Sequence, residues 1–535
     1  MADIRAFGFV IQGVEDFSVR GILIGVMIIT KFDREDNMHA RVVVIGAGPA
    51  GLTAAYLLAK ENVDVIVLES DPQYVGGIAR TVVYKKYCFD IGGHRFFSKA
   101  AEVEDFWTEI LPHDMLLRPR SSRIFYQDNF FSYPLNAAEV LRKLGVIESA
   151  SCFFSYLKAR IKPIKNPQTF ADWVTNHFGK RLFTIFFKTY TEKVWGMRCD
   201  EISADWAAQR IRGLSLWSAM INAILPKKKH STIKTLIEFF RYPRKGPGML
   251  WEACAEKISH LGSKVLMNSR VDSCQYDSGT KQWQVSYQDQ NNQKQTISAS
   301  HVISSAPLRE LVQDYLQPAL PQAAIDAAQQ LKYRDFLIVI LILKDKNQFQ
   351  DNWIYIHDPT VTVARIQNFK SWSPEMVPDP DMCCYGMEYF CFEGDGIWSA
   401  TDAQLIEKAT SEIIHIGLAK AEDILDGCVV RQPKAYPVYD DTYKANVATI
   451  RGALEHRYPT MHVIGRNGMH KYNNQDHAIM TAMLTVKNIL AGKSLYDVWN
   501  VNQDAEYIEA GVSGENNLGS ALRDVPRKVS VTIEE

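Results

Sequence analysis

The stretch that most constrains the fold is Arg41–Ser70, RVVVIGAGPAGLTAAYLLAKENVDVIVLES. Val42–Ile45 is a run of β-branched residues, which is typical of a strand buried on both faces. Glycines follow directly in the pattern G-x-G-x-x-G, and the residues from Leu52 onward have a helical pattern. A second apolar strand is predicted over Val63–Leu68, with Glu69 at its end. This order predicts a strand, a tight loop, a helix and a second strand.

The glycine loop between the first strand and the helix predicts a dinucleotide site. Gly46 allows the tight turn, Gly48 lets a pyrophosphate approach the backbone, and Gly51 lets the helix pack on the strand. An ordinary turn between a strand and a helix also uses glycine, so the second strand and its terminal acid favour the nucleotide. The pyrophosphate would lie at the positive helix N-terminus, and the acid would bind the adenosine ribose. The predicted contacts are Gly46, Gly48, Pro49, Ala50, Gly51 and Glu69.

A second glycine pair follows in the stretch SDPQYVGGIAR. Gly76 and Gly77 precede Arg80, which gives a flexible backbone segment with a cation nearby, suited to further phosphate contact. A domain that binds only NAD does not need this segment. Here the chain resembles the glutathione-reductase-like FAD superfamily, in its amine oxidase and protoporphyrinogen oxidase branch. The resemblance implies FAD as the cofactor, with further contacts at Gly93, Val271, Gly465, Arg466, Asn474 and Gln475.

Later segments fit the same superfamily. Residues 264–287 have the pattern of strand, turn and strand, and His301–Pro307 is predicted to return to the nucleotide sheet. Residues 461–490 predict a strand, a glycine loop and a helix, and in this superfamily that loop lies over the flavin. We therefore predict a two-layer α/β protein. Its Rossmann-like FAD-binding domain is built from three separated segments, and an inserted helical and antiparallel-sheet substrate domain faces the flavin.

The predicted organisation has seven parts. They are an N-terminal extension (1–38), three FAD-binding segments (39–130, 241–310 and 441–500), a mostly helical substrate part (131–240), a substrate part of sheet and helices (311–440) and a C-terminal tail (501–535).

Composition narrows the partners and the compartment. The chain has 535 residues, 47% of them hydrophobic, enough for two or three domains with a large core. A net charge of −1 gives no basic field, which argues against a nucleic-acid partner. Nine cysteines without a C-x-x-C pair argue against a disulfide framework and a zinc site. We therefore expect no metal and a cytoplasmic location, with the adjacent Cys383 and Cys384 in a strand.

The leader before the first strand contains an apolar run, Gly21–Thr30, GILIGVMIIT. Ten residues are too few to span a bilayer core, which needs about 20. Acidic residues in the leader argue against a signal peptide. Met38 is where a flavoprotein of this kind normally begins, so we assign the first 37 residues no function. The polar residues 502–535 predict a loosely held tail.

A helical, aromatic-rich stretch lies between the nucleotide-binding segments, at residues 166–213. It begins with a proline and a threonine cap, and its aromatic residues Phe183, Phe186 and Trp195 have the helical spacing that usually indicates core. Its T-F-x-x-W, K-V-W and W-x-x-x-R motifs resemble the eukaryotic-type branch of UDP-galactopyranose mutase. The blocks FDIGGHRFFS, NWIYIHDPTVTVARIQNFKSWSP and GRNGMHKYNNQDH agree, so the resemblance runs from about Arg41 to about Leu490.

This family interconverts the pyranose and furanose forms of a UDP-linked sugar, using reduced flavin as a nucleophile at the anomeric carbon. Its site holds a leaving pyrophosphate, a task that suits the planar, always charged arginine fork. By resemblance, Arg210, Arg365, Tyr436 and Tyr472 bind the diphosphate, Phe186 stacks on uracil, Trp353 contacts substrate, and His94 helps to form the productive reduced flavin. The alternative interpretations are that each arginine is an ordinary surface cation and that His94 is an ordinary histidine of a turn.

The chain departs from the mutases in the substrate half. Thr191 stands where that family has an asparagine, and the segment after Tyr472 is about two residues shorter. Arg95 and Phe96 replace smaller or purely apolar residues after the histidine. The resemblance therefore implies a small-molecule substrate, a nucleotide sugar, more directly than it implies which sugar. A reduced flavin also needs an external reductant, for which NAD(P)H is a candidate, and the oligomeric state stays open.

Two other functions compete with the mutase. The main one is an FAD oxidoreductase that removes hydride from an amine, a porphyrinogen or an apolar polyene. Residues 215–246 mix apolar runs with Lys227–Lys229, as a membrane-interface surface does, although a solvated loop is the stronger interpretation. A flavin-binding protein without catalysis would leave Arg210, Arg365 and the aromatic set without a purpose.

Overall fold

The predicted nucleotide-binding unit forms at the start of the structure, a computed structural model that describes residues 41–133, 135, 137–204 and 239–502. Strand β1 (Arg41–Ile45) leads into helix α1 (Pro49–Lys60), and β2 (Asp64–Leu68) pairs with β1 in parallel. Four of the five residues in each strand are buried, because helices cover one face of the sheet and other elements cover the other.

The sheet around β1 takes strands from distant parts of the chain. It has five parallel strands in the order β20-β13-β1-β2-β9. The added strands are β13 (His301–Ser304), β20 (Met461–Val463) and β9 (Lys264–Leu266). The predicted return of His301–Pro307 to the nucleotide sheet is confirmed, since Val42 lies opposite His301.

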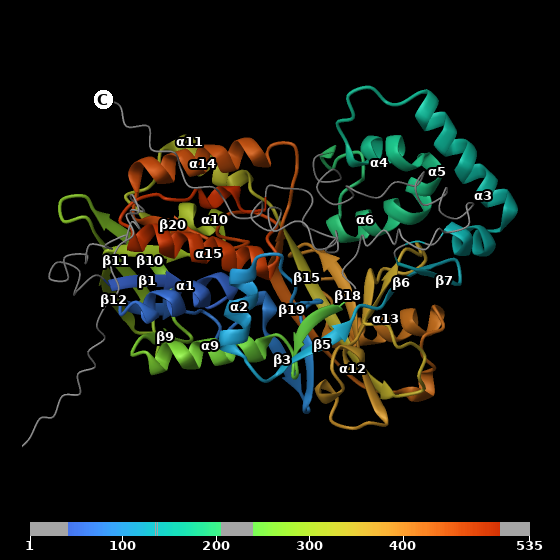
Figure 1. The fold of residues 1–535 in the computed structure, drawn as a ribbon, viewed down its shortest axis with the longest axis horizontal. Helices are drawn as coiled ribbons and strands as arrows, with labels where there is room; N and C mark the ends of the chain where they lie inside the picture. The colour runs from blue at the N-terminus through green and yellow to red at the C-terminus, as the bar shows by residue number, and fades with distance from the viewer. Residues whose placement is uncertain (1–40, 134, 136, 205–238, 503–535) are drawn as a thin grey trace, which may run out of the picture. The chain divides into compact units, whose positions relative to one another are not determined.

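Helices cover one face of this sheet, and a second sheet with further helices covers the other (Figure 1). The first face packs against α1, α2 (Ala101–Ile110), α9 (Gly248–His260) and α15 (Gln475–Leu490). The second packs against β12 (Lys294–Ala299), β11 (Gln282–Gln288), β10 (Arg270–Asp277), β14 (Leu316–Gln317), α11 (Gln322–Gln330) and α14 (Tyr443–Arg457). The nucleotide-binding part therefore has three layers where the sequence predicted two.

A seven-stranded sheet forms the core of the part predicted to bind substrate, in the order β19-β15-β18-β17-β16-β6-β7. Its strands are β19 (Ile424–Pro437), β15 (Tyr333–Lys344), β18 (Met382–Cys391), β17 (Arg365–Asn368), β16 (Trp353–Ile356), β6 (Ser122–Tyr126) and β7 (Asn129–Ser132). All neighbours are antiparallel except β16 and β6, which are parallel, so the sheet is mixed. Helix α13 (Asp402–His415) covers one face, and Cys383 and Cys384 lie in β18 as predicted.

Helices dominate residues 137–195. They are α3 (Ala137–Ile161), which bends at Gly145, α4 (Phe170–Phe178), α5 (Lys180–Phe183), a π-helical turn (Thr184–Lys188) and α6 (Thr189–Trp195). The predicted threonine cap is Thr169, whose hydroxyl accepts the Asp172 N–H at 3.1 Å. The leader, Arg210, Lys227–Lys229 and the tail lie outside the described residues.

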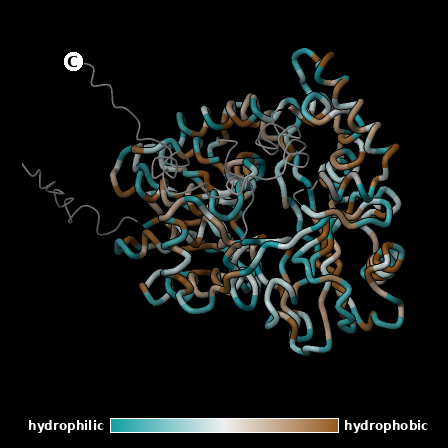
Figure 2. The backbone as a smooth tube through the Cα atoms, turned by 45° about the vertical axis from the view of Figure 1, so that its right-hand side comes forward, coloured by the Kyte–Doolittle hydropathy of each residue, from teal (hydrophilic) through white to brown (hydrophobic). Residues whose placement is uncertain are grey.

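Shorter elements complete the fold. They are the hairpin β3 (Thr81–Tyr84) and β4 (Tyr87–Asp90), the antiparallel pair β5 (Met115–Pro119) and β8 (Phe239–Pro243), and the short helices α10 (Leu308–Glu310) and α12 (Phe369–Trp372). Hydrophobic stretches of backbone concentrate in the packed elements, and many connecting loops are hydrophilic (Figure 2).

Three properties bear on the sequence predictions. No helix among the described residues is long and apolar enough to cross a membrane. Within the same ranges, no group of three metal-binding side chains comes together. All nine cysteines lie in the described part of the chain and are free thiols.

Candidate active site

The loop between β1 and α1 has the geometry of an anion cradle. The backbone of Gly46 is left-handed, with φ of +95°, and its N–H donates to the Leu68 carbonyl at 2.8 Å. A Cβ added at Gly51 would lie 1.9 Å from the Gly46 carbonyl oxygen, so helix and loop meet too closely for a side chain. A Cβ added at Gly48 would meet no atom within 4 Å, which leaves open space at the α1 N-terminus. That space suits a pyrophosphate.

Glu69 ties this loop to the end of β2. Its Oε2 accepts the Ala47 N–H at 2.6 Å, and its Oε1 accepts the Asp71 N–H at 2.9 Å. The Ser269 N–H donates to the Glu69 carbonyl at 2.7 Å, which brings the start of β10 alongside. Val271 follows there, and the β10–β11 ladder shifts just after it. Glu69, predicted to bind the adenosine ribose, and Val271, predicted as a further FAD contact, therefore lie on neighbouring segments.

The second glycine pair packs directly on the first loop. The Gly76 N–H donates to the Ala47 carbonyl at 2.8 Å, and a Cβ at Gly77 would lie 3.4 Å from the Gly48 Cα. Both glycines have left-handed backbones, with φ of +98° and +55°. Arg80 donates from Nη1 to the Gly77 carbonyl at 3.0 Å, while its Nε is buried without a partner among the described residues. A buried, unpaired donor beside an open cradle fits an anionic cofactor.

The third predicted segment joins the same place from the C-terminal side. Gly465, with φ of +77°, follows β20, and a Cβ there would lie 3.0 Å from the Ala50 Cβ. Helix α15 then begins after Asn474, which caps it together with His477. The first residue of α15, Gln475, donates from Nε2 to the Arg95 carbonyl at 3.2 Å, and its Oε1 is buried without a partner in the described structure. The predicted FAD contacts thus converge from segments that are far apart in sequence.

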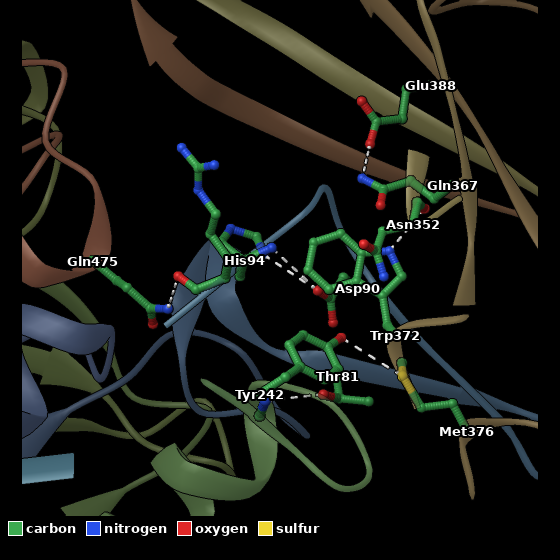
Figure 3. A network of polar contacts seen from close by, with 12 residues as sticks. Thr81, Asp90, His94, Tyr242, Asn352, Gln367, Trp372, Met376, Glu388 and Gln475 are labelled. Atoms are coloured by element: carbon green, nitrogen blue, oxygen red, sulfur yellow. Dashed lines mark hydrogen bonds and ion pairs between the residues drawn. The ribbon is translucent and has the colours of Figure 1, made fainter. Parts of the chain in front are cut away.

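The turn Gly92–Gly93–His94 connects this cradle to the seven-stranded sheet (Figure 3). A Cβ at Gly93 would lie 2.9 Å from the Gln367 Nε2 and 3.1 Å from the Trp372 ring, so the turn rests directly on the substrate half. The His94 Nδ1 is buried without a hydrogen bond and lies 3.9 Å from a carboxylate oxygen of Asp90. Burial, with Arg466 and Arg365 nearby, lowers the pKa of His94 to about 3, so its imidazole is neutral at neutral pH.

Arg365 is held by a buried carboxylate on the neighbouring strand. Its Nε and Nη2 donate to the two oxygens of Glu388 at 2.6 and 2.9 Å, and Glu388 is fully buried. Gln367 donates to the same carboxylate at 2.6 Å (Figure 3). The guanidinium lies beside the turn, since its Nη2 would be 3.9 Å from a Cβ at Gly92. The guanidinium of Arg365 is therefore fixed in place, and its third nitrogen, Nη1, donates to no described residue.

Two tyrosines and a second arginine form the neighbouring group. The rings of Tyr436 and Tyr472 are stacked, with centroids 5.5 Å apart and planes at 15°. The Arg466 guanidinium lies 5.1 Å and 5.2 Å from the two ring centroids. Its Nε and Nη1 donate to the carbonyls of Asn473 and Ala435. Burial, followed by the proximity of Tyr472, raises the pKa of Tyr436, so its hydroxyl keeps its proton.

Several residues of the site were missed from the sequence. Glu388 and Gln367 fix Arg365, and Tyr355 lies directly opposite Arg365 in the β16–β17 pair. Tyr190 on α6 contacts Tyr355 edge to face at 5.2 Å. Glu388 had a readable signal, because it is the one acidic residue in the otherwise apolar strand β18. Tyr355 had another, because it lies two residues after Trp353 and so on the same face of its strand.

Two predicted substrate residues lie in aromatic packing. Phe186 is 3% exposed and packs on Phe131 with ring centroids 5.3 Å apart. Trp353 stacks on Trp372 at 5.4 Å. Tyr355 packs against both clusters, so it links them to Arg365. Arg210 lies outside the described residues, and its role stays a prediction.

Known proteins share this fold. The model of the family described as flavin-containing amine oxidoreductase matches residues 49–413. An L-amino-acid oxidase of Crotalus adamanteus is 25% identical over 325 residues, which cover 57% of this chain and 58% of that protein. A dTDP-fucopyranose mutase of Escherichia coli is 26% identical over 170 residues, which cover 31% of this chain and 44% of that protein.

A solved structure of reduced UDP-galactopyranose mutase superposes with a TM-score of 0.73, covering 85% of this chain and 96% of that one. Its sequence identity is 21%, so this likeness establishes the fold alone. The chain spans only 58% of the length of the L-amino-acid oxidase. The relatives therefore include both oxidases and mutases.

Proposed function

Because the chain belongs to the flavin-containing amine oxidoreductase family and FAD is its cofactor, we propose that it isomerises a nucleotide-linked sugar between pyranose and furanose forms. When bound and reduced, the flavin supplies a nucleophile at the anomeric carbon. The chain's own task is to hold the nucleoside diphosphate while the sugar is detached and returned. This proposal accounts for the cations and hydroxyls beside the Gly92–His94 turn.

The observation that carries the proposal is the pair of partly buried arginines, Arg365 and Arg466, beside His94. Arg365 and Arg466 both lower the pKa of that histidine, so the region is cationic. Glu388 offsets one of these charges, and Asp90 offsets little, because burial raises its pKa well above the usual range. A departing diphosphate needs such a field, and charge-assisted hydrogen bonds to arginine and tyrosine would retain it.

The FAD would be held by the three segments that meet at the β1–α1 loop. The backbone around Gly48 and the α1 N-terminus would take the pyrophosphate, Glu69 the ribose, and Arg80 a phosphate oxygen. The remaining proposed contacts are Gly46, Pro49, Ala50, Gly51, Gly76, Gly77, Gly93, Val271, Gly465, Arg466, Asn474 and Gln475.

Each substrate-side residue then has a physical task. Arg365, fixed by Glu388, presents its Nη1 to a diphosphate oxygen, and the hydroxyls of Tyr436 and Tyr472 donate beside it. His94 is neutral, so one of its ring nitrogens can donate a hydrogen bond and the other can accept one. The aromatic residues Phe186, Trp353 and Tyr355 exclude water around the sugar and its base.

Oxidation of an amine or amino acid is the second candidate, because the L-amino-acid oxidases match more of the chain than the dTDP-fucopyranose mutase does. A guanidinium such as Arg365 would also bind a carboxylate. An ammonium group, however, would have to compete with Arg466, which already lies over both tyrosine rings. The charge distribution therefore favours an anionic ligand without a cationic reacting group.

The two candidates give different products. Dithionite-reduced protein is incubated without oxygen with UDP-galactose and, separately, with a dTDP-linked deoxysugar, and furanose product is measured by chromatography. We expect product with one of them, and none when the flavin is oxidised. An oxidase instead gives no isomer, and releases hydrogen peroxide from L-amino acids or amines in air. That second result would overturn the isomerase proposal.

Two properties complete the proposal. NAD(P)H is the electron donor we propose for the flavin, and it is tested by replacing dithionite with NADH or NADPH. The cytoplasm is the compartment we propose, and the nine free thiols support it.

A further inference from the structure

Helix α3 exposes a concentration of large apolar side chains. After the break at Gly145, where φ is 79°, the helix continues to Ile161. The described residues include twelve exposed large hydrophobic side chains, and six of these lie between residues 146 and 164. They are Val146 (85% exposed), Ile147 (89%), Phe153 (39%), Phe154 (67%), Ile161 (76%) and Ile164 (42%). Such a concentration on one segment, α3 and the residues just after it, marks a surface that is covered by something else.

The exposed residues follow one line along the helix. Ile147, Phe154 and Ile161 are seven residues apart, so each lies about 20° from the previous one on the helix surface. We call this line, with the adjoining Val146 and Phe153, the α3 stripe. The opposite face of the same helix packs on the protein through Cys152, Tyr156 and Ala159, which are buried. The helix is therefore apolar on two sides, whereas one apolar side is enough to attach it to its own domain.

Cations border the far end of the stripe. Lys158, Arg160, Lys162 and Lys165 are exposed, and none of them forms an ion pair with a residue that the structure describes. No acidic residue occurs from Ser149 to Ala171. At about 100° per residue, Lys158 and Arg160 lie on opposite flanks of the line through Phe154. Their long stems can lie along an apolar surface while their charges reach outward on both sides.

The charges beside the α3 stripe distinguish between two possible partners for this surface, a second copy of the chain and a lipid bilayer. A second copy of the chain would bring the same cations into its own interface. The two acidic residues of α3 would not pair with them, since Glu139 is already paired with Lys143 and Glu148 with Arg181. A bilayer surface with anionic headgroups would receive the apolar line below and pair the flanking cations above. We propose that the α3 stripe rests on the surface of a lipid bilayer that contains anionic headgroups. This surface is independent of the proposed isomerase activity.

The test measures co-sedimentation of the flavin-loaded, full-length protein with vesicles. Vesicles of phosphatidylcholine with phosphatidylglycerol should retain the protein, and vesicles of phosphatidylcholine alone should retain much less. The double variant Phe154→Glu with Ile161→Glu should bind more than about tenfold more weakly, because two apolar anchors are lost. Replacing Lys158 by Glu should weaken binding about fivefold or more at low salt, and high salt should remove that difference.

Leu425→Glu is the matched control, because Leu425 is 55% exposed but lies on β19, away from α3. It should bind vesicles as the wild type does. Equal flavin content and equal thermal unfolding of all variants would show that each is folded. Failure of the wild type to bind the anionic vesicles, or equal binding by the stripe variant, overturns the proposal. So does a concentration-dependent dimer, seen by light scattering, that the stripe variant abolishes, because the occupant is then a second copy.

Discussion

Removal of the Arg365 side chain should weaken the fold as well as the ligand site. In Arg365→Met, Glu388 remains fully buried as a charge without its cation, and only the Gln367 amide still donates to it. Breaking a buried ion pair in this way costs about 3–5 kcal/mol of the free energy of unfolding. That is a large share of the roughly 5–15 kcal/mol that stabilises a typical protein.

The double variant Arg365→Met with Glu388→Leu should be less destabilised than the single one. The uncompensated charge is then gone, and the main loss is the acceptor of the Gln367 amide, which costs about 1–3 kcal/mol. Urea unfolding of wild type, both single variants and the double variant, followed by tryptophan fluorescence, gives the coupling energy. Arg198→Met is the matched control, because the Arg198–Asp200 pair has similar distances but is exposed, and no measurable change is expected.

The contribution of Arg365 to ligand binding is measured with the variant Arg365→Lys, which keeps a cation beside Glu388. An ammonium cannot reproduce the fork, so UDP should bind more weakly by about 1.5–3 kcal/mol, with flavin content unchanged. If Arg365→Met unfolded at the same urea concentration as the wild type, the buried pair would carry no such energy, and the view of Arg365 as a fixed cation would be wrong.

Three further predictions concern the glycine loop, His357 and Arg210. Gly48→Val should fold, because a Cβ there meets no atom within 4 Å, yet lose its flavin absorbance, whereas Gly51→Val should fail to fold because its Cβ would lie 1.9 Å from a carbonyl oxygen. Burial lowers the pKa of His357 to about 3 from 6.5, so its contribution is present above pH 6.5 and is lost toward pH 3. His357→Phe should therefore remove about 1.4 kcal/mol per pH unit from the pH dependence of unfolding between pH 4 and 6. Arg210→Ala should weaken UDP binding by about 1.5–3 kcal/mol without loss of flavin, as measured by titration of the flavin spectrum.

The nucleotide-binding part could be predicted because its signals are local. The strand, glycines, helix and acid of Arg41–Ser70 are consecutive, and each has a conformational reason that can be read from its neighbours. The return strand β13 and the final strand β20 were also visible as short apolar runs beside glycine or proline. The third layer was not, because the face that a sheet offers to α11 and α14 depends on tertiary packing.

The substrate side could be predicted only in part, since its contacts join distant residues. Glu388 matters because the β17–β18 register places it opposite Arg365, and Arg80 meets Gln432 across most of the chain. No short stretch of the sequence contains both members of either pair. Phe186 illustrates a second limit. Aromatic residues at helical spacing give the same sequence pattern whether they pack in the core or stack on a nucleotide base.

The order of strands in the parallel sheet has a consequence for biosynthesis. On the ribosome, β1 and β2 emerge first, while β13 and β20, which complete their sheet, are residues 301–304 and 461–463. Until then β1, whose residues Val42–Ile45 are buried in the finished sheet, has no strand on one side. The Gly465 loop that closes against Ala50 is made later still. We therefore expect FAD to be captured only at the end of translation or after it, and the nascent chain to expose the edge of β1 for most of its synthesis.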